Sequence, residues 1–259
     1  MKQISSVCMA AVRPIIWKLL LIIVLMAALE IGLFWYQMPP EPVIPDPNVS
    51  VTVYSNGYAV GRSIGQRFDS VLDGAWFAWI LRAALVALYL VQVMQGSDSN
   101  GKLTYTLRRL PMGERAVTAL WASVHMVSYW ILWAAQLAVV LGCWKLYTIS
   151  YPTHSSALEL FTKFYFSDFL HGLIPMQNYA RVAANGLMFM ALGLGAAYLG
   201  FRSRTGRKAI LPVVLIAVTM NFTTASFQDD FADGLMILIY AVSIGYMIWQ
   251  IWVNEYEEA

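Results

Sequence analysis

Two charged side chains interrupt apolar stretches of this sequence and are its clearest candidates for chemistry. Glu30 lies within the apolar residues 27–33, and Arg82 lies within 79–85. On consecutive antiparallel helices, Glu30 is expected about 9 Å and Arg82 about 12 Å below the same membrane surface. An unpaired charge in a membrane helix costs about 2.5–3.5 kcal/mol, so the matching depths predict a buried ion pair. The pair has two interpretations: it pins two helices together, or it takes part in coupling or substrate binding.

Residues 96–103, Gly-Ser-Asp-Ser-Asn-Gly-Lys-Leu, have the glycine and lysine spacing of a phosphate-binding P-loop. The match fails at Leu103, where the motif needs a serine or threonine to contact magnesium. The segment also follows an apolar helix pattern instead of a buried strand. No HExxH or CxxC motif occurs. We therefore expect no cofactor, no metal ligand and no catalytic residue in this chain.

The elements that must position these residues are predicted to be membrane-spanning helices. The chain has 259 residues, of which 59% are hydrophobic and 12% are charged, whereas soluble domains are about 45–50% apolar and about 25% charged. The mean hydropathy is +0.59, and the net charge of +2 does not favour nucleic-acid binding. A helix needs about 20 apolar residues to cross a bilayer. We predict one all-α transmembrane domain over 1–259, with six spans at about 15–36, 74–94, 117–147, 183–201, 210–227 and 234–253.

The distribution of lysine and arginine predicts the orientation, because these residues concentrate in short cytoplasmic loops. If the N-terminus is inside, eleven of the 17 basic residues are cytoplasmic, and the last outer loop, 229–233, carries only acidic charge. Both termini are therefore predicted to be cytoplasmic. The eleven residues are Lys2, Arg13, Lys18, Lys102, Arg108, Arg109, Arg115, Arg202, Arg204, Arg207 and Lys208.

Three smaller elements are expected outside the spans. Apolar residues at helical spacing within 4–12 predict a short surface helix that ends at Pro14. Valines alternate with polar residues over 49–54, and Asn56-Gly57 follows, which predicts a small hairpin. Residues 155–172 predict an outer interfacial helix that is partly sunk in the leaflet or packed on the bundle. Its narrow polar stripe is Glu159, Lys163, Ser167 and His171. The helix is interpreted as a simple anchor or as a gate that contacts an amphipathic substrate.

The predicted cytoplasmic loop between the second and third spans combines leucine and basic residues. Leu103, Leu107 and Leu110 lie at helical spacing, and Pro111 ends that pattern before a new helix begins near Glu114. One interpretation is a basic loop that obeys the positive-inside rule. The other is a short helix that lies across the inner surface and docks into a groove of a partner protein.

This loop resembles the coupling segment in the permease subunits of ABC-2 type exporters. The residues that match are Gly101, Leu107, Arg108, Leu110, Pro111 and Arg115. The resemblance implies six spans in a bacterial cell membrane, with two copies of the chain, or one copy and a related permease, around a pathway. It also implies separate cytoplasmic ATPase subunits that carry ATP and Mg²⁺. The implied ATPase-coupling residues are Lys102, Tyr105, Leu107, Arg108, Arg109, Leu110, Glu114 and Arg115.

Within this class, the size of the chain is similar to exporters of amphipathic peptides such as phenol-soluble modulins and bacteriocins. One departure is that many members carry re-entrant helices between spans five and six, whereas the 228–233 linker here is too short for a separate pair. The polar half of 210–227 is predicted to line the pathway, through Thr219, Asn221, Thr223 and Thr224. Two alternatives remain: an ATP-independent secondary carrier that uses Glu30 and Arg82, and a non-transporting immunity or sensor protein in the membrane.

Overall fold

The computed structural model of the chain has five helices that are long and apolar enough to cross a membrane. They are α1 (Lys2–Gln37), α3 (Phe77–Gly96), α5 (Glu114–Ser150), α8 (Tyr179–Arg204) and α10 (Asp230–Val253). The helices α2 (Phe68–Gly74), α7 (Asp168–Leu173) and α9 (Leu211–Phe222) are shorter, and β1 (Thr52–Ser55) and β2 (Tyr58–Gly61) are strands. The residues that the structure describes are 2–38, 52–55, 58–61, 68–97, 113–150, 160, 164, 167–175, 178–204, 209–222 and 230–253.

Five of the six predicted spans are confirmed as apolar helices of sufficient length, which indicates a multi-pass membrane protein. The predicted span 210–227 is described only as α9, whose 12 residues extend about 18 Å. That length is less than the hydrocarbon core of about 30 Å. Residues 223–227 lie outside the described part of the chain, so a sixth span remains a prediction.

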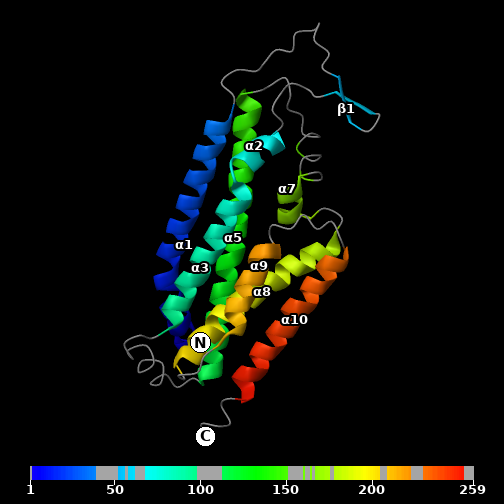
Figure 1. The fold of residues 1–259 in the computed structure, drawn as a ribbon. Coiled ribbons are helices and arrows are strands. Elements are labelled where there is room, and N and C mark those ends of the chain that lie inside the picture. The colour runs from blue at the N-terminus through cyan, green and yellow to red at the C-terminus, as the bar shows by residue number, and fades with distance from the viewer. Residues whose placement is uncertain are drawn as a thin grey trace.

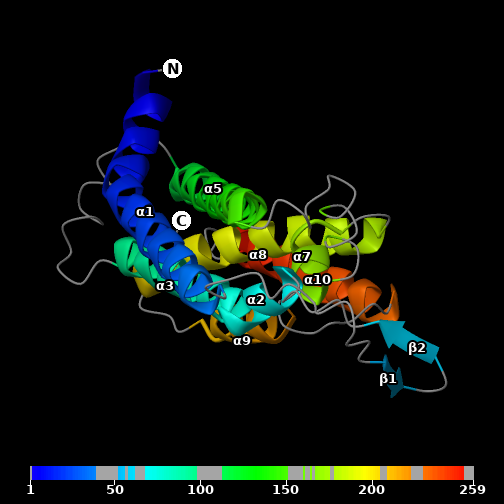
Figure 2. The same ribbon diagram turned by 90° about the horizontal axis from the view of Figure 1, so that it is seen from above.

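All the long helices and α9 share one apolar core. α1, α3 and α5 lie side by side, α8 crosses beside them, and α9 and α10 pack on α8 (Figure 1). The view from above shows the same arrangement (Figure 2). α1 begins and α10 ends at the same end of the bundle, whereas the hairpin lies at the opposite end. Representative core side chains from the six helices are Met26, Leu88, Leu132, Leu192, Leu215 and Tyr240.

Glycines allow α8 to approach its neighbours closely. A Cβ atom added at Gly193 would lie 2.7 Å from the backbone nitrogen of Met126 on α5. One added at Gly200 would lie 2.9 Å from the Cα of Gly96 on α3. Small residues at such crossings bring helix backbones together in membrane proteins. The two crossings therefore set how far α8 is from α5 and α3, and which side chains can meet.

The predicted break at Pro14 is wrong, because α1 continues through it from Lys2 to Gln37. Ala11 and Ile15, on either side of Pro14, are buried against other helices. The Nε2 group of Gln95 on α3 donates a hydrogen bond to the Pro14 carbonyl at 3.0 Å. Packing against α3 and α5 stabilises a continuous helix where local chain preference favours an end.

A turn separates α2 from α3, so the helix predicted to begin at 74 begins at Phe77. Trp76 has a left-handed backbone conformation with φ 60°, which redirects the chain between the two helices. The predicted hairpin is confirmed over its described part: β1 and β2 pair antiparallel, from Ser55 opposite Tyr58 to Thr52 opposite Gly61. The first part of the predicted alternation, residues 49–51, lies outside the described residues.

The predicted continuous helix over 155–172 is wrong at Ser167. Ser167 has extended backbone angles, and its hydroxyl oxygen accepts a hydrogen bond from the Leu170 backbone N–H, so it caps the start of α7. Of the polar stripe, Ser167 and His171 are described, whereas Glu159 and Lys163 lie outside the described residues. Leu170 and Leu173 are buried with side chains from α2, α3 and α5. α7 is therefore packed on the bundle.

Candidate functional site

Glu30 is buried in the interior of the bundle, at the contact between α1 and α5. Its side chain is completely shielded from solvent. Its Oε2 atom accepts a hydrogen bond of 3.0 Å from Nε2 of Gln136 on α5. The other carboxyl oxygen, Oε1, has no partner among the described residues, and the same holds for Oε1 of Gln136. Intramembrane ionisable residues mark functional sites in many membrane proteins, so this pair is a first candidate.

The predicted ion pair between Glu30 and Arg82 is wrong, although both residues lie in the described part of the chain. The Arg82 guanidinium carbon lies 4.3 Å from the ring centroid of Trp79, one turn earlier on α3. Trp79 is exposed on the outside of the bundle. Arg82 is about 7.5 Å from the start of α3, within reach of the helix end by snorkelling. The predicted depths did not determine the pairing, because the two side chains point in different directions around their helices.

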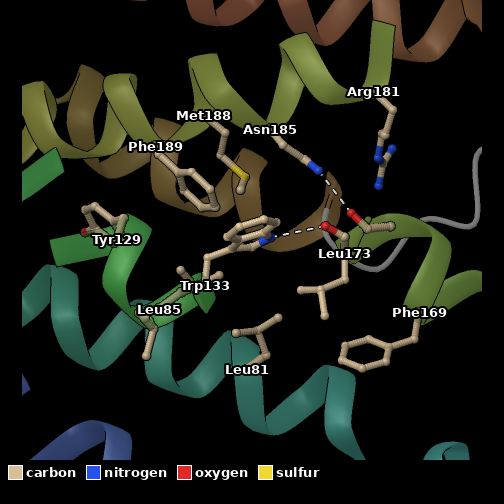
Figure 3. Close-up of a pocket in the computed structure, with 12 residues that line it drawn as sticks. Leu81, Leu85, Tyr129, Trp133, Phe169, Leu173, Arg181, Asn185, Met188 and Phe189 are labelled. Atoms are coloured by element: carbon tan, nitrogen blue, oxygen red, sulfur yellow. Dashed lines mark hydrogen bonds between the residues drawn. The ribbon is translucent and has the colours of Figure 1, made fainter. Parts of the chain in front are cut away.

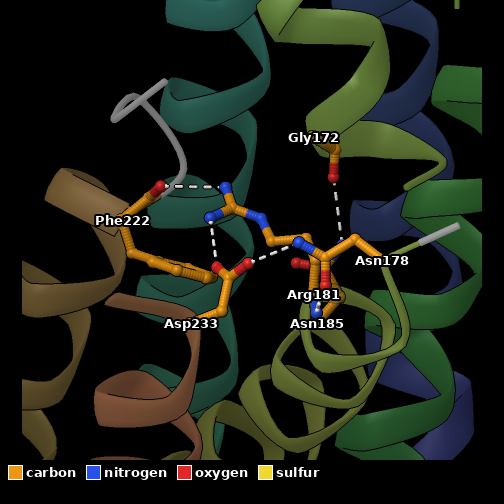
Figure 4. Close-up of polar contacts among 6 residues, drawn as sticks. All are labelled: Gly172, Asn178, Arg181, Asn185, Phe222 and Asp233. Carbon is orange, nitrogen blue, oxygen red and sulfur yellow. Dashed lines mark hydrogen bonds and ion pairs between the residues drawn. The ribbon is translucent and has the colours of Figure 1, made fainter. Parts of the chain in front are cut away.

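A buried ion pair forms elsewhere, where α8, α9 and α10 meet. Nη1 of Arg181 donates to Oδ1 of Asp233 at 2.9 Å, and Nη2 donates to the Phe222 carbonyl at 3.3 Å. Nδ2 of Asn178 donates to Oδ2 of Asp233 at 3.0 Å. The Phe222 ring lies 3.9 Å from the guanidinium carbon. Figure 4 shows these four residues, which we call the Arg181 clasp.

The clasp uses groups that only helix ends can offer. Asn178 accepts the Arg181 backbone N–H through Oδ1 at 2.9 Å and so caps the start of α8. Asp233 lies in the first turn of α10, where the helix dipole favours negative charge. The Phe222 carbonyl is the last backbone group of α9 in the described part of the chain, and there it accepts from Nη2 of Arg181. Both Nη atoms of Arg181 and both carboxylate oxygens of Asp233 therefore have a hydrogen-bond partner.

Sequence reasoning missed this clasp. On the predicted spans, Arg181 directly precedes 183–201 and Asp233 directly precedes 234–253, so the two residues fall in separate outer loops. The signal that was available is the one used for Glu30 and Arg82, namely opposite charges at the same end of neighbouring spans. Applied to 183–201 and 234–253, it indicates that Arg181 and Asp233 lie at the same end of the bundle, but not that the two side chains meet.

A small cavity lies beneath α7, between α3, α5 and α8 (Figure 3). Its volume is about 50 Å³, and its lining is mostly apolar, with Arg181 and Asn185 on one side. Trp133 Nε1 donates to the Leu173 carbonyl at 3.1 Å, and Asn185 Nδ2 donates to the Gly172 carbonyl at 3.0 Å. These bonds hold the end of α7 onto α5 and α8. The cavity has room for a few water molecules, which is far less than a peptide substrate requires.

The buried face of α5 carries further polar side chains towards its first half. The Thr118 hydroxyl donates to the Glu114 carbonyl, and the Ser128 hydroxyl donates to the Val124 carbonyl, both within α5. Gln92 of α3 donates through Nε2 to the His125 carbonyl at 3.3 Å. Together with Gln136, these residues form a polar face within an otherwise apolar bundle. Buried polar residues also sit at helix contacts in bundles with no transport role, because they hydrogen-bond across them.

The predicted pathway residues do not lie on one face of α9. Thr219 is buried, and its hydroxyl bonds to the Leu215 carbonyl at 2.8 Å and to the Tyr240 hydroxyl at 3.2 Å. Asn221 is exposed, and its Nδ2 group bonds to the Ala217 carbonyl at 2.9 Å. Side chains that are two positions apart on a helix point in directions that differ by about 200° around its axis. Thr223 and Thr224 lie outside the described residues, and a pathway role for the set stays a prediction.

Two of the predicted ATPase-coupling residues are described. Nη2 of Arg115 donates to the Trp252 carbonyl at 2.7 Å, and its guanidinium lies 4.8 Å from the Trp252 ring centroid. The start of α5 is thereby tied to the end of α10, and Glu114 is the first residue of α5. The other coupling residues, Lys102, Tyr105, Leu107, Arg108, Arg109 and Leu110, lie outside the described residues.

One spacing typical of a catalytic serine does occur in this chain, although no catalytic residue is predicted. Residues 61–65 read Gly-Arg-Ser-Ile-Gly, the GxSxG spacing of serine hydrolases. That motif belongs at a sharp turn from a strand of an α/β sheet into a helix. Here Gly61 ends β2 of a two-stranded antiparallel hairpin, and 62–67 lie outside the described residues. The context on the strand side does not match, and we assign no catalytic role to Ser63.

The chain matches no protein-family model, no curated protein and no solved structure. Within the described residues, no group of three or more histidine, cysteine, aspartate or glutamate side chains is placed to hold a metal ion.

Proposed function

We propose that this chain is the transmembrane subunit of an ATP-driven exporter of the ABC-2 type. In this proposal it has six spans with both termini cytoplasmic, lies in a bacterial cell membrane, and pairs with a second copy or a related permease. Separate cytoplasmic ATPase subunits bind ATP and Mg²⁺ and drive transport. The substrate is an amphipathic peptide or a lipid-like molecule.

The observation that carries the proposal is the way α5 follows the basic loop. α5 has 37 residues and extends about 55 Å, well beyond a hydrocarbon core of about 30 Å. Its first turn comes directly after residues 101–112 and is bonded to the end of α10 through Arg115. A force applied to the loop would therefore reach two long helices together, as coupling to an ATPase requires.

The coupling role is tested by reversing charge in the loop. Arg108→Glu with Arg109→Glu should abolish co-purification with the ATPase encoded by a neighbouring reading frame, and should abolish ATP-dependent export. The matched control is Arg207→Glu with Lys208→Glu, which reverses two charges in another basic loop at the same predicted side. Wild-type ATPase recovery and export in the loop variant would contradict the docking role.

The pathway role of α9 is tested by cysteine labelling in a background without Cys8 and Cys143. We expect a water-soluble thiol reagent to label Asn221→Cys, which is on the exposed face, and a bound peptide to protect it. Thr219→Cys, on the buried face, is the control and should stay unlabelled. Absence of labelling at both positions in every nucleotide state would contradict a pathway along α9.

One observation favours a second candidate function, an ATP-independent secondary carrier. Glu30 is buried within a span, and its Oε1 atom has no partner among the described residues. Acidic side chains within spans form the proton relays of pumps and transporters. The two functions are separated by transport in sealed vesicles. Uptake driven by an imposed proton gradient without ATP favours the carrier, whereas uptake that needs ATP and the partner ATPase favours the exporter.

A further inference from the structure

Only one oxygen of the Glu30 carboxyl takes part in the contact with Gln136. Its single hydrogen bond runs from Gln136 Nε2 to Glu30 Oε2. The two remaining oxygens, Oε1 of each side chain, are buried and have no partner in the part of the chain that the structure describes. Buried polar atoms are nearly always paired, so two orphaned oxygens on one contacting pair need a common explanation.

Charge gives no such explanation, because the surroundings do not compensate a carboxylate. No cationic side chain of the described residues forms an ion pair with Glu30, and Arg82 of α3 lies over Trp79 instead. On α5, Gln136 donates to Glu30, and Cys143 lies buried two turns further along the same face of that helix. On α2, Asp73 is exposed. An ionised carboxyl with one neutral donor inside an apolar bundle is strongly disfavoured.

We propose that Glu30 is a proton-binding site, in which its protonated carboxyl and the Gln136 amide form a closed pair. The Glu30 hydroxyl, on Oε1, donates to Oε1 of Gln136, while Gln136 Nε2 donates to Oε2 of Glu30. A carboxylic acid and a primary amide each offer one donor and one acceptor at the required spacing. This arrangement gives both orphaned oxygens a partner with no change in the observed hydrogen bond, and it does not depend on the exporter proposal.

Loss of that proton has a direct structural consequence. The Oε1 atom of Glu30 turns from donor to acceptor and then faces another acceptor, the Oε1 atom of Gln136. One of the two hydrogen bonds is lost, and a negative charge remains between α1 and α5. Either water enters the contact or the two helices separate locally. The contact between α1 and α5 is therefore expected to depend on the protonation of Glu30.

The decisive measurement is the infrared spectrum of the full chain in lipid bilayers at neutral pH. The wild type should show a carbonyl band of a protonated carboxylic acid that shifts in heavy water, and Glu30→Gln should lose it. Glu30→Gln keeps two amide hydrogen bonds and is expected to fold. Glu114→Gln is the matched control and should keep the band.

A second measurement needs no variant. An apolar carbodiimide reacts with protonated carboxyl groups in apolar surroundings, and mass spectrometry of the wild type should locate the adduct at Glu30. Labelling should fall at least tenfold when the protein is first brought to a pH at which the infrared band disappears. A wild type without the band and without the adduct, or a band that survives in Glu30→Gln, overturns the proposal.

Discussion

Asp233 and Glu30 are both fully buried acids in the same helix bundle, but their surroundings differ. Asp233 receives hydrogen bonds from Arg181 and Asn178 and lies in the first turn of α10. Glu30 lies seven residues before the end of α1, where the backbone N–H groups are used within the helix, and among the described residues it receives one bond, from the neutral amide of Gln136. Helix ends supply unpaired backbone groups and a favourable dipole, whereas the middle of a helix supplies neither.

The two arginines differ in the same way. Arg181 lies between three helix ends, with a carboxylate, a backbone carbonyl and an aromatic ring as partners. Arg82 is on the flank of α3, partly exposed, over the ring of Trp79. This bundle therefore stabilises buried charge at its helix ends. Within the spans it either turns the charge outwards or, as proposed for Glu30, neutralises it.

The largest effect is expected from breaking the clasp. Asp233→Asn leaves the Arg181 guanidinium buried without its counter-charge, which should cost about 3–5 kcal/mol of stability. Thermal unfolding in lipid or detergent measures the loss, and Glu30→Gln is the matched carboxyl-to-amide control. If the two variants lose equal stability, the proposed difference between the two acids is incorrect.

The next test compares coupling within each region. Arg181→Met and Asp233→Leu should be strongly non-additive, because the double variant removes both charges from the interior. Arg82→Leu and Glu30→Gln should be additive within about 0.3–0.5 kcal/mol, because the two side chains do not meet. A coupling of more than 1 kcal/mol between Glu30 and Arg82 would restore the original ion-pair prediction.

A smaller effect is expected at the amide partner of Glu30. Gln136→Leu removes the one hydrogen-bond donor that the described residues offer to the Glu30 carboxyl, and should cost about 1–3 kcal/mol. Adding Glu30→Leu should recover much of this loss, because no buried polar atom of the pair then remains unpaired. Unfolding measurements on the two variants check this recovery, and an undiminished loss in the double variant argues against a direct pair.

The smallest effect is expected at Arg82. Arg82→Leu removes the contact with Trp79, which is worth about 0.5–1 kcal/mol for a cation over an exposed ring. Arg82→Lys should keep most of that contact and serves as the control. Folded yield and unfolding temperature measure both variants, and a loss as large as that of Asp233→Asn would place Arg82 in an unrecognised buried contact.

What the sequence determines about this protein follows from local and one-dimensional properties. Apolar length places five helices, with the predicted 117–147 observed as Glu114–Ser150 and 183–201 as Tyr179–Arg204. The hairpin at 52–61 was also predicted correctly, because its strands pair with their nearest neighbours in the chain. The depth of a charge along a helix is likewise set by counting residues from the helix end.

Contacts between side chains of different helices depend on how each helix is rotated about its axis and how the helices cross, which is fixed only when they pack together. The close approach of Gly193 on α8 to Met126 on α5 fixes part of that geometry. Packing also overrides the local preference for a helix end at Pro14, and a side-chain cap at Ser167 starts a new helix within a continuous apolar pattern. Glu30 therefore meets an amide on α5, and the clasp joins residues of α8, α9 and α10. Neither the direction of a side chain around its helix axis nor the proximity of two helices in space can be obtained by counting residues along the chain.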